Sequence, residues 1–368
     1  MNCVRRLVLE SNGCFVFEER ALPQPSEDEF LVDVKSAGIF STDIPRAFVN
    51  GAYEYPLVLG HEFSGFIAAM RGQPSCLPGL STDGRAAIFP LKPCFRCESC
   101  DIQQYQRCKQ YSYHGSREDG GFCEGLIVKK WNVLFAPRSI SYEDLALVEP
   151  LSVVVHAAAV VDETSLNLAS DRVGIFGSGF LGLMMVDILT GNGVQKVSVF
   201  DRNRFKLEKL KCKDVEKNCI RDFRELTEGR RNQQHDLDIV IEMTGSPDAL
   251  EAAILMCNPG GTIILVGNPL SDASISKDFY SQILRKELSI KGSWNSSFKS
   301  SVRDDWQLSM EILNSGYKPS QYITHRSSLS NAHFLLEGIA SKGSKPEFSN
   351  FIKGLINVSK NKSCNTML

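Results

Sequence analysis

The sequence predicts a two-domain α/β protein in which a β-rich domain is joined to a doubly wound parallel sheet. Its 368 residues are enough for about two domains. The first 140 residues contain short strand-like runs between Gly, Pro and Asp turns. From residue 171 onwards, strand-like and helix-like segments alternate, a pattern typical of a parallel sheet covered on both faces.

The individual elements follow from these patterns. Strands are expected at 30–34, 63–69, 85–89 and 122–128 in the first part, and at 172–176, 196–200, 237–243 and 262–266 in the second. Helices are expected at 183–189, 204–211 and 248–256. Residues 142–161 are helical in pattern, and Pro150 predicts that a new helix begins near Leu151.

Composition and charge exclude several classes of protein. Hydrophobic residues make up 43% of the chain and charged residues 23%, as in an ordinary globular protein. The chain has 41 Lys and Arg residues against 43 Asp and Glu residues. Because basic residues are not in excess, we expect no nucleic-acid partner. The longest apolar runs, such as 151–161, are shorter than the ~20 residues of a membrane span. Residues 1–25 lack a signal-peptide core, so we expect a cytoplasmic protein with no membrane partner and 12 reduced cysteines.

A glycine-rich turn after the strand at 172–176 predicts a dinucleotide site. Residues 177–182 read Gly-Ser-Gly-Phe-Leu-Gly, the G-x-G-x-x-G pattern, and a helix follows them. The first glycine allows the tight turn, the second the approach of a pyrophosphate, and the third close helix–strand packing. Free N–H groups at the helix start favour phosphate groups. The candidate cofactor-binding residues here are Gly177, Gly179, Phe180, Leu181 and Gly182.

The second strand of this unit ends at Asp201, 19 residues after Gly182. A carboxylate there accepts hydrogen bonds from the adenine-ribose hydroxyls and repels a 2′-phosphate, which favours NAD over NADP. Arg202 and Arg204 lie close by in the sequence and weaken that preference. The alternative is another doubly wound fold, such as a flavodoxin-like one, with a glycine-rich turn and no nicotinamide cofactor.

Four cysteines lie within 15 residues in the order Cys94-x2-Cys97-x2-Cys100-x7-Cys108. Thiolates at this spacing can converge on Zn²⁺ at about 2.3 Å, and a site with four protein ligands is structural. The sequence therefore predicts a structural zinc. An iron–sulfur cluster or a chance grouping of free cysteines are the alternatives.

Together these features resemble the zinc-dependent medium-chain alcohol dehydrogenase family, and most of all its polyol dehydrogenase branch. The resemblance covers nearly the whole length, apart from the last ~25 residues. Longer similar stretches lie at 43–46, 50–65, 93–95, 115–122 and 283–294. The short motifs that carry the resemblance are Gly60-His61-Glu62, the four cysteines, Glu149-Pro150-Leu151 followed by His156, and the glycine-rich turn with Asp201.

The resemblance implies how the two domains are arranged along the chain. Residues 1–152 and 292–368 would form a GroES-like catalytic domain, with the structural zinc lobe at 90–110. Residues 153–291 would form a Rossmann NAD-binding domain, and the active site would lie between the two domains. Members of the family commonly form homodimers or homotetramers through the edge strand of the Rossmann sheet, here near 288–291.

The family's catalytic zinc is held by a Cys, by the His-Glu pair and, in the polyol branch, by the Glu of Glu-Pro. His61, Glu62 and Glu149 match these positions, but the cysteine position is occupied by Phe40. Three hypotheses follow from Phe40. The metal is retained by His61, by Glu62 or Glu149, and by water; or it is absent and polar groups alone guide the reaction; or the site is catalytically inactive.

The resemblance assigns roles to further residues. Thr42 would relay the proton of the alcohol, with the capping of a turn as the alternative. Asp43 would orient His61, with a capping role before Pro45 as the alternative. Arg46 is a candidate contact for a substrate phosphate, and His156 is expected to be a packed helix histidine rather than a ligand. Lys206 would reach the adenine ribose, with a solvated helix lysine as the alternative. The expected nicotinamide-lining residues, otherwise a strand-end turn and a core tryptophan, are Val266, Gly267, Asn268, Gly292, Ser293 and Trp294.

The resemblance thus implies an NAD-dependent oxidoreductase that interconverts a secondary alcohol and a ketone. The expected substrate is a small polyol or sugar phosphate. The hydride would pass to the nicotinamide, and the proton would leave through Thr42 and the ribose hydroxyls. The rival hypothesis is a non-catalytic or zinc-independent NAD-binding homologue, because Phe40 replaces the zinc-binding cysteine.

Overall fold

A computed structural model of the chain describes residues 3–69, 84–164, 167–227, 237–269, 271–341 and 344–358. The chain divides into two compact units. Unit 1 consists of Met1–Ser152 and Ser297–Leu368, and unit 2 of Val153–Ser296. These junctions follow residues 152 and 296, and the domain boundaries expected from the sequence follow residues 152 and 291. In the described part of the chain, no helix has both the length and the hydrophobicity that crossing a bilayer requires.

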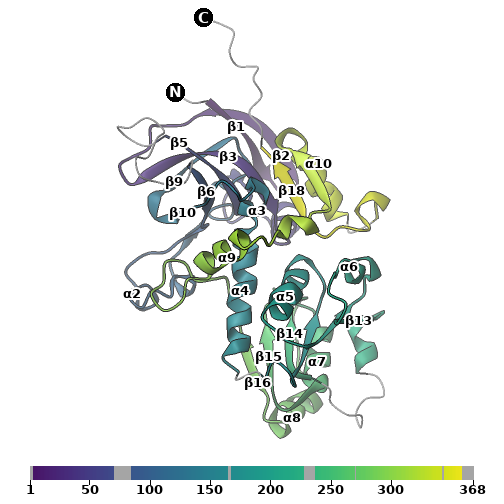
Figure 1. Ribbon diagram of the computed structural model, residues 1–368. Coiled ribbons are helices and arrows are strands. Elements are labelled where there is room, and N and C mark those ends of the chain that lie inside the picture. Colours follow the sequence, from purple (N-terminus) through teal and green to yellow (C-terminus); the bar gives the residue numbers. More distant parts are fainter. Residues whose placement is uncertain are drawn as a thin grey trace, which may run out of the picture. The chain divides into compact units, whose positions relative to one another are not determined.

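Unit 1 contains a sheet centred on β3 (Glu29–Ile39). β3 pairs with β5 on one edge and with both β9 and β18 along its length, all antiparallel. The yellow β18 therefore lies beside the purple β3, so segments from the two ends of the chain share one sheet (Figure 1). The other strands of this sheet are β5 (Glu62–Ala69), β6 (Arg85–Ile88), β9 (Gly125–Lys129), β10 (Val133–Phe135), β17 (His325–Ser328) and β18 (Gly354–Asn357).

Smaller sheets and helices complete unit 1. A three-stranded sheet has the order β2 (Cys14–Ala21), β1 (Cys3–Ser11), β4 (Leu57–Val58), and a short hairpin joins β7 (Leu91–Lys92) to β8 (Ser112–Tyr113). The helices are α1 (Asp43–Phe48), α2 (Glu98–Asp101), α3 (Tyr142–Ala146), the start of α4 (Val148–Asp162), α9 (Asp305–Asn314) and α10 (Ala332–Ala340). Short 3₁₀ turns lie at Tyr105–Arg107, Lys130–Asn132, Pro319–Tyr322, Leu329–Asn331 and Pro346–Phe348.

The core of unit 1 explains why β3 is apolar along most of its length. A strand with neighbours on both edges and packed faces has no side that must be polar. Val32, Val34 and Ile39 of β3 are buried together with Phe63 and Phe122. This packing fixes the carboxyl end of β3 and the start of β5, which are the backbone segments that carry Phe40 and Glu62.

Unit 2 is a parallel six-stranded sheet in the order β13-β12-β11-β14-β15-β16. Its strands are β11 (Arg172–Phe176), β12 (Lys196–Asp201), β13 (Glu216–Cys219), β14 (Leu237–Glu242), β15 (Cys257–Leu265) and β16 (Ser289–Gly292). Its helices are the rest of α4, α5 (Phe180–Gly191), α6 (Arg204–Glu208), α7 (Pro247–Met256) and α8 (Lys277–Arg285), with a 3₁₀ turn at Phe223–Leu226.

The strand order of unit 2 reverses between β11 and β14. From β11 the chain moves outwards to β12 and β13, and it then returns to the other side of β11 as β14. In open α/β sheets, ligands bind at the carboxyl ends of the strands where the order reverses in this way. The glycine-rich turn follows β11 at this reversal.

Local differences from the predicted elements have identifiable causes. The predicted strand at 122–128 begins only at Gly125, because the backbone of residues 120–122 bonds instead to residues 58–60. α4 begins at Val148 rather than near Leu151, with Pro150 in its first turn, where proline costs no hydrogen bond. The helix predicted at 204–211 ends at Glu208.

Candidate active site

Three predicted metal ligands of unit 1 converge in the structure. His61 lies directly before β5, Glu62 is the first residue of β5, and Glu149 lies in the first turn of α4. One ligand atom from each of the three lies within 4.8 Å of the others, and all three side chains are buried. Residues far apart in the sequence therefore form one acidic cluster around an imidazole, and His156 is not part of it.

Asp43 lies beside His61, as the family resemblance implies. Its Oδ1 is 3.6 Å from Nδ1 of His61 and 3.6 Å from Nη1 of Arg46, and its Oδ2 accepts a hydrogen bond from the Phe40 backbone N–H at 2.9 Å. Burial alone would raise the pKa of Asp43, but the charges of His61 and Arg46 outweigh it and hold this pKa below its ordinary value. Burial likewise opposes charge on His61, and Asp43 nevertheless raises the pKa of the imidazole.

A buried lysine is part of the cluster and was not found by the sequence analysis. Lys353, just before β18, donates hydrogen bonds to Oε1 of Glu62 at 2.6 Å and to the Ile39 carbonyl at 3.1 Å. Its side chain is 3% exposed and that of Glu62 is 0% exposed. Lys353 stands in the C-terminal segment that fits the family pattern poorly, and no motif marks it. Only the pairing of β18 with β3 brings it to Glu62.

Phe40 packs against two basic groups of the cluster. Its ring lies edge-to-face on His61 with 5.2 Å between the ring centroids, and Nζ of Lys353 lies 5.6 Å from the Phe40 centroid. A phenyl ring has no lone pair to give to a metal, but its face attracts a cation. At this position the chain therefore contributes apolar contact and a weak cation site instead of a thiolate.

Tyr113 adds a hydroxyl to the cluster. Its O–H donates to Oε1 of Glu149 at 3.1 Å, and its ring lies 5.7 Å from that of His61. Burial raises the pKa of Glu149 to about 7, with Glu62 acting in the same direction and His61 opposing it. Tyr113 ends β8 close to the cysteine segment, and the sequence gives no motif that would have identified it.

The donor atoms of the cluster fit a divalent cation without a thiolate ligand. Zinc binds imidazole nitrogen and carboxylate oxygen at about 2.0–2.2 Å. Oε2 of Glu149 is buried and has no hydrogen-bond partner among the described residues, so this carboxylate can still accept a cation. Glu62 already faces the ammonium of Lys353. His61 and Glu149 are therefore the stronger candidate ligands, and Glu62 is the weaker one.

Thr42 lies at the start of α1, between Phe40 and Asp43. It occupies the N-cap position, but its side chain makes no capping hydrogen bond. The alternative that the Thr42 hydroxyl caps the turn is therefore wrong. The backbone carbonyl of Thr42 does accept a hydrogen bond from Arg46 N–H at 3.3 Å. The side chain is half-buried, and no capping interaction occupies its Oγ1.

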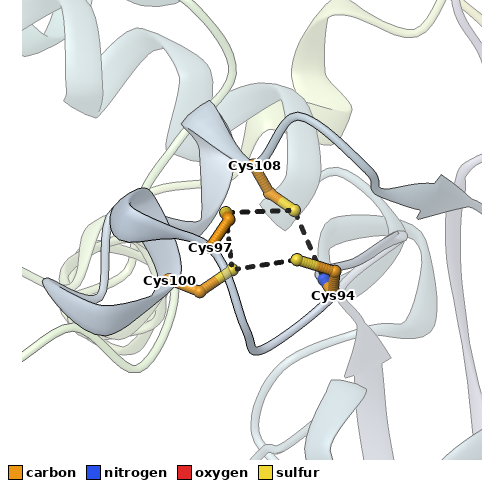
Figure 2. Close-up of side chains that lie close together, drawn as sticks. All are labelled: Cys94, Cys97, Cys100 and Cys108. Carbon is orange, nitrogen blue, oxygen red and sulfur yellow. Dashed lines mark hydrogen bonds between the residues drawn. The ribbon is translucent and has the colours of Figure 1, made fainter.

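The four cysteines form a compact sulfur cluster in unit 1 (Figure 2). Sγ of Cys97 lies 3.6 Å from that of Cys100 and 3.9 Å from that of Cys108, and the Cys94–Cys100 separation is 4.0 Å. Tetrahedral zinc with bonds of about 2.3 Å places its sulfurs about 3.8 Å apart. Burial raises the pKa of the Cys100 thiol to about 12, so a bound cation is needed to keep it ionised at neutral pH. The donor set fits a structural zinc.

The glycine-rich turn of unit 2 has the geometry that the pattern predicts. Gly177 has φ of 100°, and a Cβ added there would lie 2.7 Å from Thr244 Cγ2. A Cβ at Gly182 would lie 2.0 Å from the Gly177 carbonyl oxygen, because α5 packs tightly on the turn. A Cβ at Gly179, the N-cap of α5, would meet nothing within 4 Å. The backbone at Gly179 is therefore open to a ligand at the start of the helix that Phe180 and Leu181 begin.

Asp201 lies against this turn. Its Oδ2 accepts from Ser178 N–H at 2.6 Å, and its Oδ1 accepts from Asn203 N–H at 2.7 Å. The carboxylate is half-buried and therefore retains solvent-facing surface beside the turn. Lys206 is a half-buried residue of α6, which Asn203 caps.

Two further loops lie at the same end of the sheet. Glu242 ends β14 and accepts hydrogen bonds from Thr244 N–H at 2.6 Å and Gly245 N–H at 3.0 Å, and burial raises its pKa. A Cβ at Gly267 would lie 2.2 Å from Gly245 N, so the predicted segment 266–268 packs on this loop. The sequence analysis missed Glu242, although an acidic residue that ends an apolar strand was a visible signal.

The predicted residues after β15 and β16 belong to this unit as well. Val266 and Gly267 both donate backbone N–H groups to the Glu242 carbonyl, at 2.9 and 3.0 Å. Ser293 N–H donates to the Leu265 carbonyl at 2.9 Å. Trp294 is 56% exposed, so the alternative of a core tryptophan is wrong.

Comparison with known proteins places this arrangement in a family. A family model described as zinc-binding dehydrogenase matches residues 181–315, and one described as alcohol dehydrogenase GroES-like domain matches residues 26–138. Galactitol 1-phosphate 5-dehydrogenase of Escherichia coli strain K12 is 31% identical over 318 residues, which are 84% of this chain and 88% of that one. The chain belongs to the zinc-dependent medium-chain alcohol dehydrogenases. This confirms the family resemblance and the GroES-like plus Rossmann fold class.

Two solved structures share the fold of this chain, and a further relative is similar in sequence. The crystal structure of galactitol-1-phosphate dehydrogenase from Escherichia coli has a TM-score of 0.81 at 30% identity, covering 96% of this chain and 99% of that one. A crystal structure from Escherichia coli CFT073, described as a short chain alcohol dehydrogenase complexed with the cofactor NADH, has a TM-score of 0.79 at 26% identity, covering 97% of this chain and 100% of that one. A sorbitol dehydrogenase of Bacillus subtilis is 31% identical over 279 residues, which are 72% of this chain and 75% of that one.

Proposed function

We propose that this medium-chain dehydrogenase catalyses the reversible, NAD-dependent oxidation of a secondary alcohol of a polyol or sugar phosphate. The main support is the convergence of His61, Glu62 and Glu149 in a chain whose second unit carries the dinucleotide turn. Two relatives that are each 31% identical to this chain are named for galactitol 1-phosphate and sorbitol, which are both polyol compounds. Turnover of NAD with a panel of polyols and polyol phosphates tests the proposal directly.

Unit 1 would bind the alcohol and manage its proton. His61 and Glu149 would hold a divalent cation, with Glu62 as a weaker third ligand, and the bound cation would lower the pKa of the alcohol. Asp43 would fix the orientation of the His61 ring through Nδ1. The Thr42 hydroxyl, whose side chain caps nothing, can both accept and donate a proton.

Unit 2 would bind NAD. The open backbone at Gly179 would receive the pyrophosphate, and Asp201 would accept from the ribose hydroxyls while opposing a 2′-phosphate. Lys206 and the loops around Val266–Asn268 and Gly292–Trp294 are the further candidate contacts. Calorimetric titration with NADH and NADPH tests this preference, and tighter binding of NADPH would contradict it.

A second candidate is a zinc-independent or non-catalytic NAD-binding homologue. The charge balance of the cluster favours this second candidate, because the buried carboxylates are neutralised by basic side chains without a metal ion. Three buried carboxylates are matched by three basic groups, namely Asp43, Glu62 and Glu149 against Arg46, His61 and Lys353. The variant Phe40→Cys separates the candidates. A gain of zinc or activity supports a metal site that lacks its thiolate, whereas unchanged zinc and unchanged activity would show that Phe40 does not control the metal.

The proposal includes two further properties, a structural zinc and an oligomeric assembly. The four cysteines would hold a structural zinc, as their sulfur separations support. Among the described strands, β16 pairs with β15 alone, and its Ile290 is 40% exposed, which suits a homodimer or homotetramer formed along this edge. Light scattering coupled to size exclusion tests the assembly. A cytoplasmic location stays a prediction, which cell fractionation tests.

A further inference from the structure

Unit 1 carries an arginine whose guanidinium lies over two aromatic rings, an arrangement called the clamp below. The guanidinium carbon of Arg117 lies 4.2 Å from the ring centroid of Tyr111 and 4.8 Å from that of Tyr53. The faces of the rings attract the positive charge, and the N–H groups of a guanidinium lie within its own plane. Arg117 is exposed, and no carboxylate of the described part of the chain forms an ion pair with it. The positive charge is therefore held in place and uncompensated there.

The clamp is connected to the acidic cluster by a row of rings. Tyr111 packs edge-to-face on Tyr113 with 6.1 Å between centroids, and Tyr113 contacts the His61 ring and donates to Glu149. The backbone N–H of Arg117 also donates to the Tyr113 carbonyl at 2.9 Å. The same short segment of chain thus positions one side chain on the cluster and another in the clamp.

Tight backbone packing keeps this segment in place. A Cβ at Gly115 would lie 2.7 Å from the carbonyl carbon of Gly60, the residue that precedes His61. Gly115 N–H donates to the Glu118 carbonyl at 2.8 Å, which closes the turn that carries Arg117. Because the turn rests on the backbone next to His61, the backbone that carries Arg117 has a fixed position relative to the cluster.

We propose that Arg117 is the subsite that binds the phosphate group of a phosphorylated polyol in this dehydrogenase, an inference that rests on the function proposed above. A phosphate monoester carries up to two negative charges and several acceptor oxygens, and a planar guanidinium can bind two of them at once. The rings of Tyr53 and Tyr111 restrict the orientations of the Arg117 guanidinium, which lowers the conformational entropy lost when a ligand binds. Arg117 is thus a specificity residue for the phosphorylated end of the substrate, and it takes no part in the hydride or proton steps.

The test compares galactitol 1-phosphate with galactitol in steady-state kinetics of the full-length protein. For Arg117→Ala we expect KM for the phosphorylated substrate to rise roughly 10- to 100-fold, the range of a lost charge-assisted hydrogen bond, with little change in kcat. KM for galactitol should stay unchanged. Arg117→Lys keeps the positive charge but loses the planar guanidinium that can donate two hydrogen bonds at once. Its KM for galactitol 1-phosphate should therefore lie between those of the wild type and Arg117→Ala. Tyr53→Leu, at a side chain that is 68% exposed, should raise KM only for the phosphorylated substrate.

A matched control and a binding measurement separate this inference from the proposed function. Arg107→Ala removes another exposed arginine of unit 1, which donates to Gln104, and it should change neither KM. Calorimetric titration with galactitol 1-phosphate measures binding without turnover. If galactitol 1-phosphate binds the wild type and not Arg117→Ala, the subsite is supported, even if the protein oxidises no polyol. The absence of polyol oxidation would refute the proposed function and not the subsite.

Other outcomes would overturn the inference. If the wild type oxidises galactitol and galactitol 1-phosphate equally well and Arg117→Ala leaves both KM values unchanged, the subsite does not exist although the dehydrogenase function stands. If Arg117→Ala instead raises KM only for a sugar acid such as L-idonate, the guanidinium binds a carboxylate and the assignment to phosphate is wrong.

Discussion

The buried pair of Lys353 and Glu62 gives the strongest prediction of the structure. Replacing Lys353 by Met removes the ammonium and leaves the Glu62 carboxylate buried without its cation. Because the two side chains are only 3% and 0% exposed, water cannot replace the lost partner. Breaking a buried ion pair in this way costs about 3–5 kcal/mol of unfolding free energy. We therefore expect a large drop in the denaturant midpoint of unit 1.

Two controls accompany this measurement. The double variant Lys353→Met with Glu62→Gln removes both charges and should recover most of the lost stability, since a matched neutral pair leaves no unpaired ion. Lys129→Met removes a lysine that is 40% exposed and pairs with Glu29 at 3.0 Å, and it should cost far less. A Lys353→Met protein as stable as the Lys129→Met protein would refute the idea that Lys353 neutralises Glu62.

Three further predictions concern the dinucleotide site and the surface. Gly182→Ala should abolish NADH binding or the folding of unit 2, because its Cβ would lie 2.0 Å from a carbonyl oxygen. A Cβ at Gly191, on the same helix, would meet nothing within 4 Å, so Gly191→Ala should leave NADH binding by calorimetry and the circular dichroism spectrum unchanged. Asp201→Ser should shift the ratio of NADP to NAD turnover towards NADP by at least several-fold, and an unchanged ratio would contradict the assigned role. The hydrogen bonds from Arg326 lower the pKa of Glu143, although burial opposes this shift. The contribution of the pair to stability is therefore complete above the ordinary pKa of 4.5, and it is lost as the pH falls through the lower pKa of the folded state. Melting curves of the wild type and Arg326→Gln should therefore differ at pH 7 and converge towards pH 3, and a gap that persists at low pH would argue against this linkage.

The sequence predicted the parts of the fold that depend on local patterns. The glycine-rich turn sits between a strand and a helix, and the structure shows why Gly177 and Gly182 tolerate no side chain. The four cysteines converge because their spacing lies within one short segment. Asp201 reaches the turn because parallel strands end at the same edge of the sheet.

The parts that were missed depend on long-range pairing. Lys353 reaches Glu62 only because β18 pairs with β3, and no local pattern encodes that register. Tyr113 reaches Glu149 through the fold of the loop after the cysteines. Arg117 lies in a stretch that the sequence comparison had marked as similar to the family, but its aromatic clamp requires Tyr53, which is remote in the chain. Phe40 was recognised as a departure, and the structure adds the two cations that it contacts.

The most direct test of the account is the formation of NADH by the purified protein with galactitol 1-phosphate, alongside its metal content. We expect steady NADH formation, two divalent cations per chain, and loss of both activity and one cation in His61→Ala. A protein that binds NADH and holds a single zinc, yet oxidises no polyol or polyol phosphate with or without added metal, would contradict the claim that His61, Glu149 and their neighbours form a working dehydrogenase site.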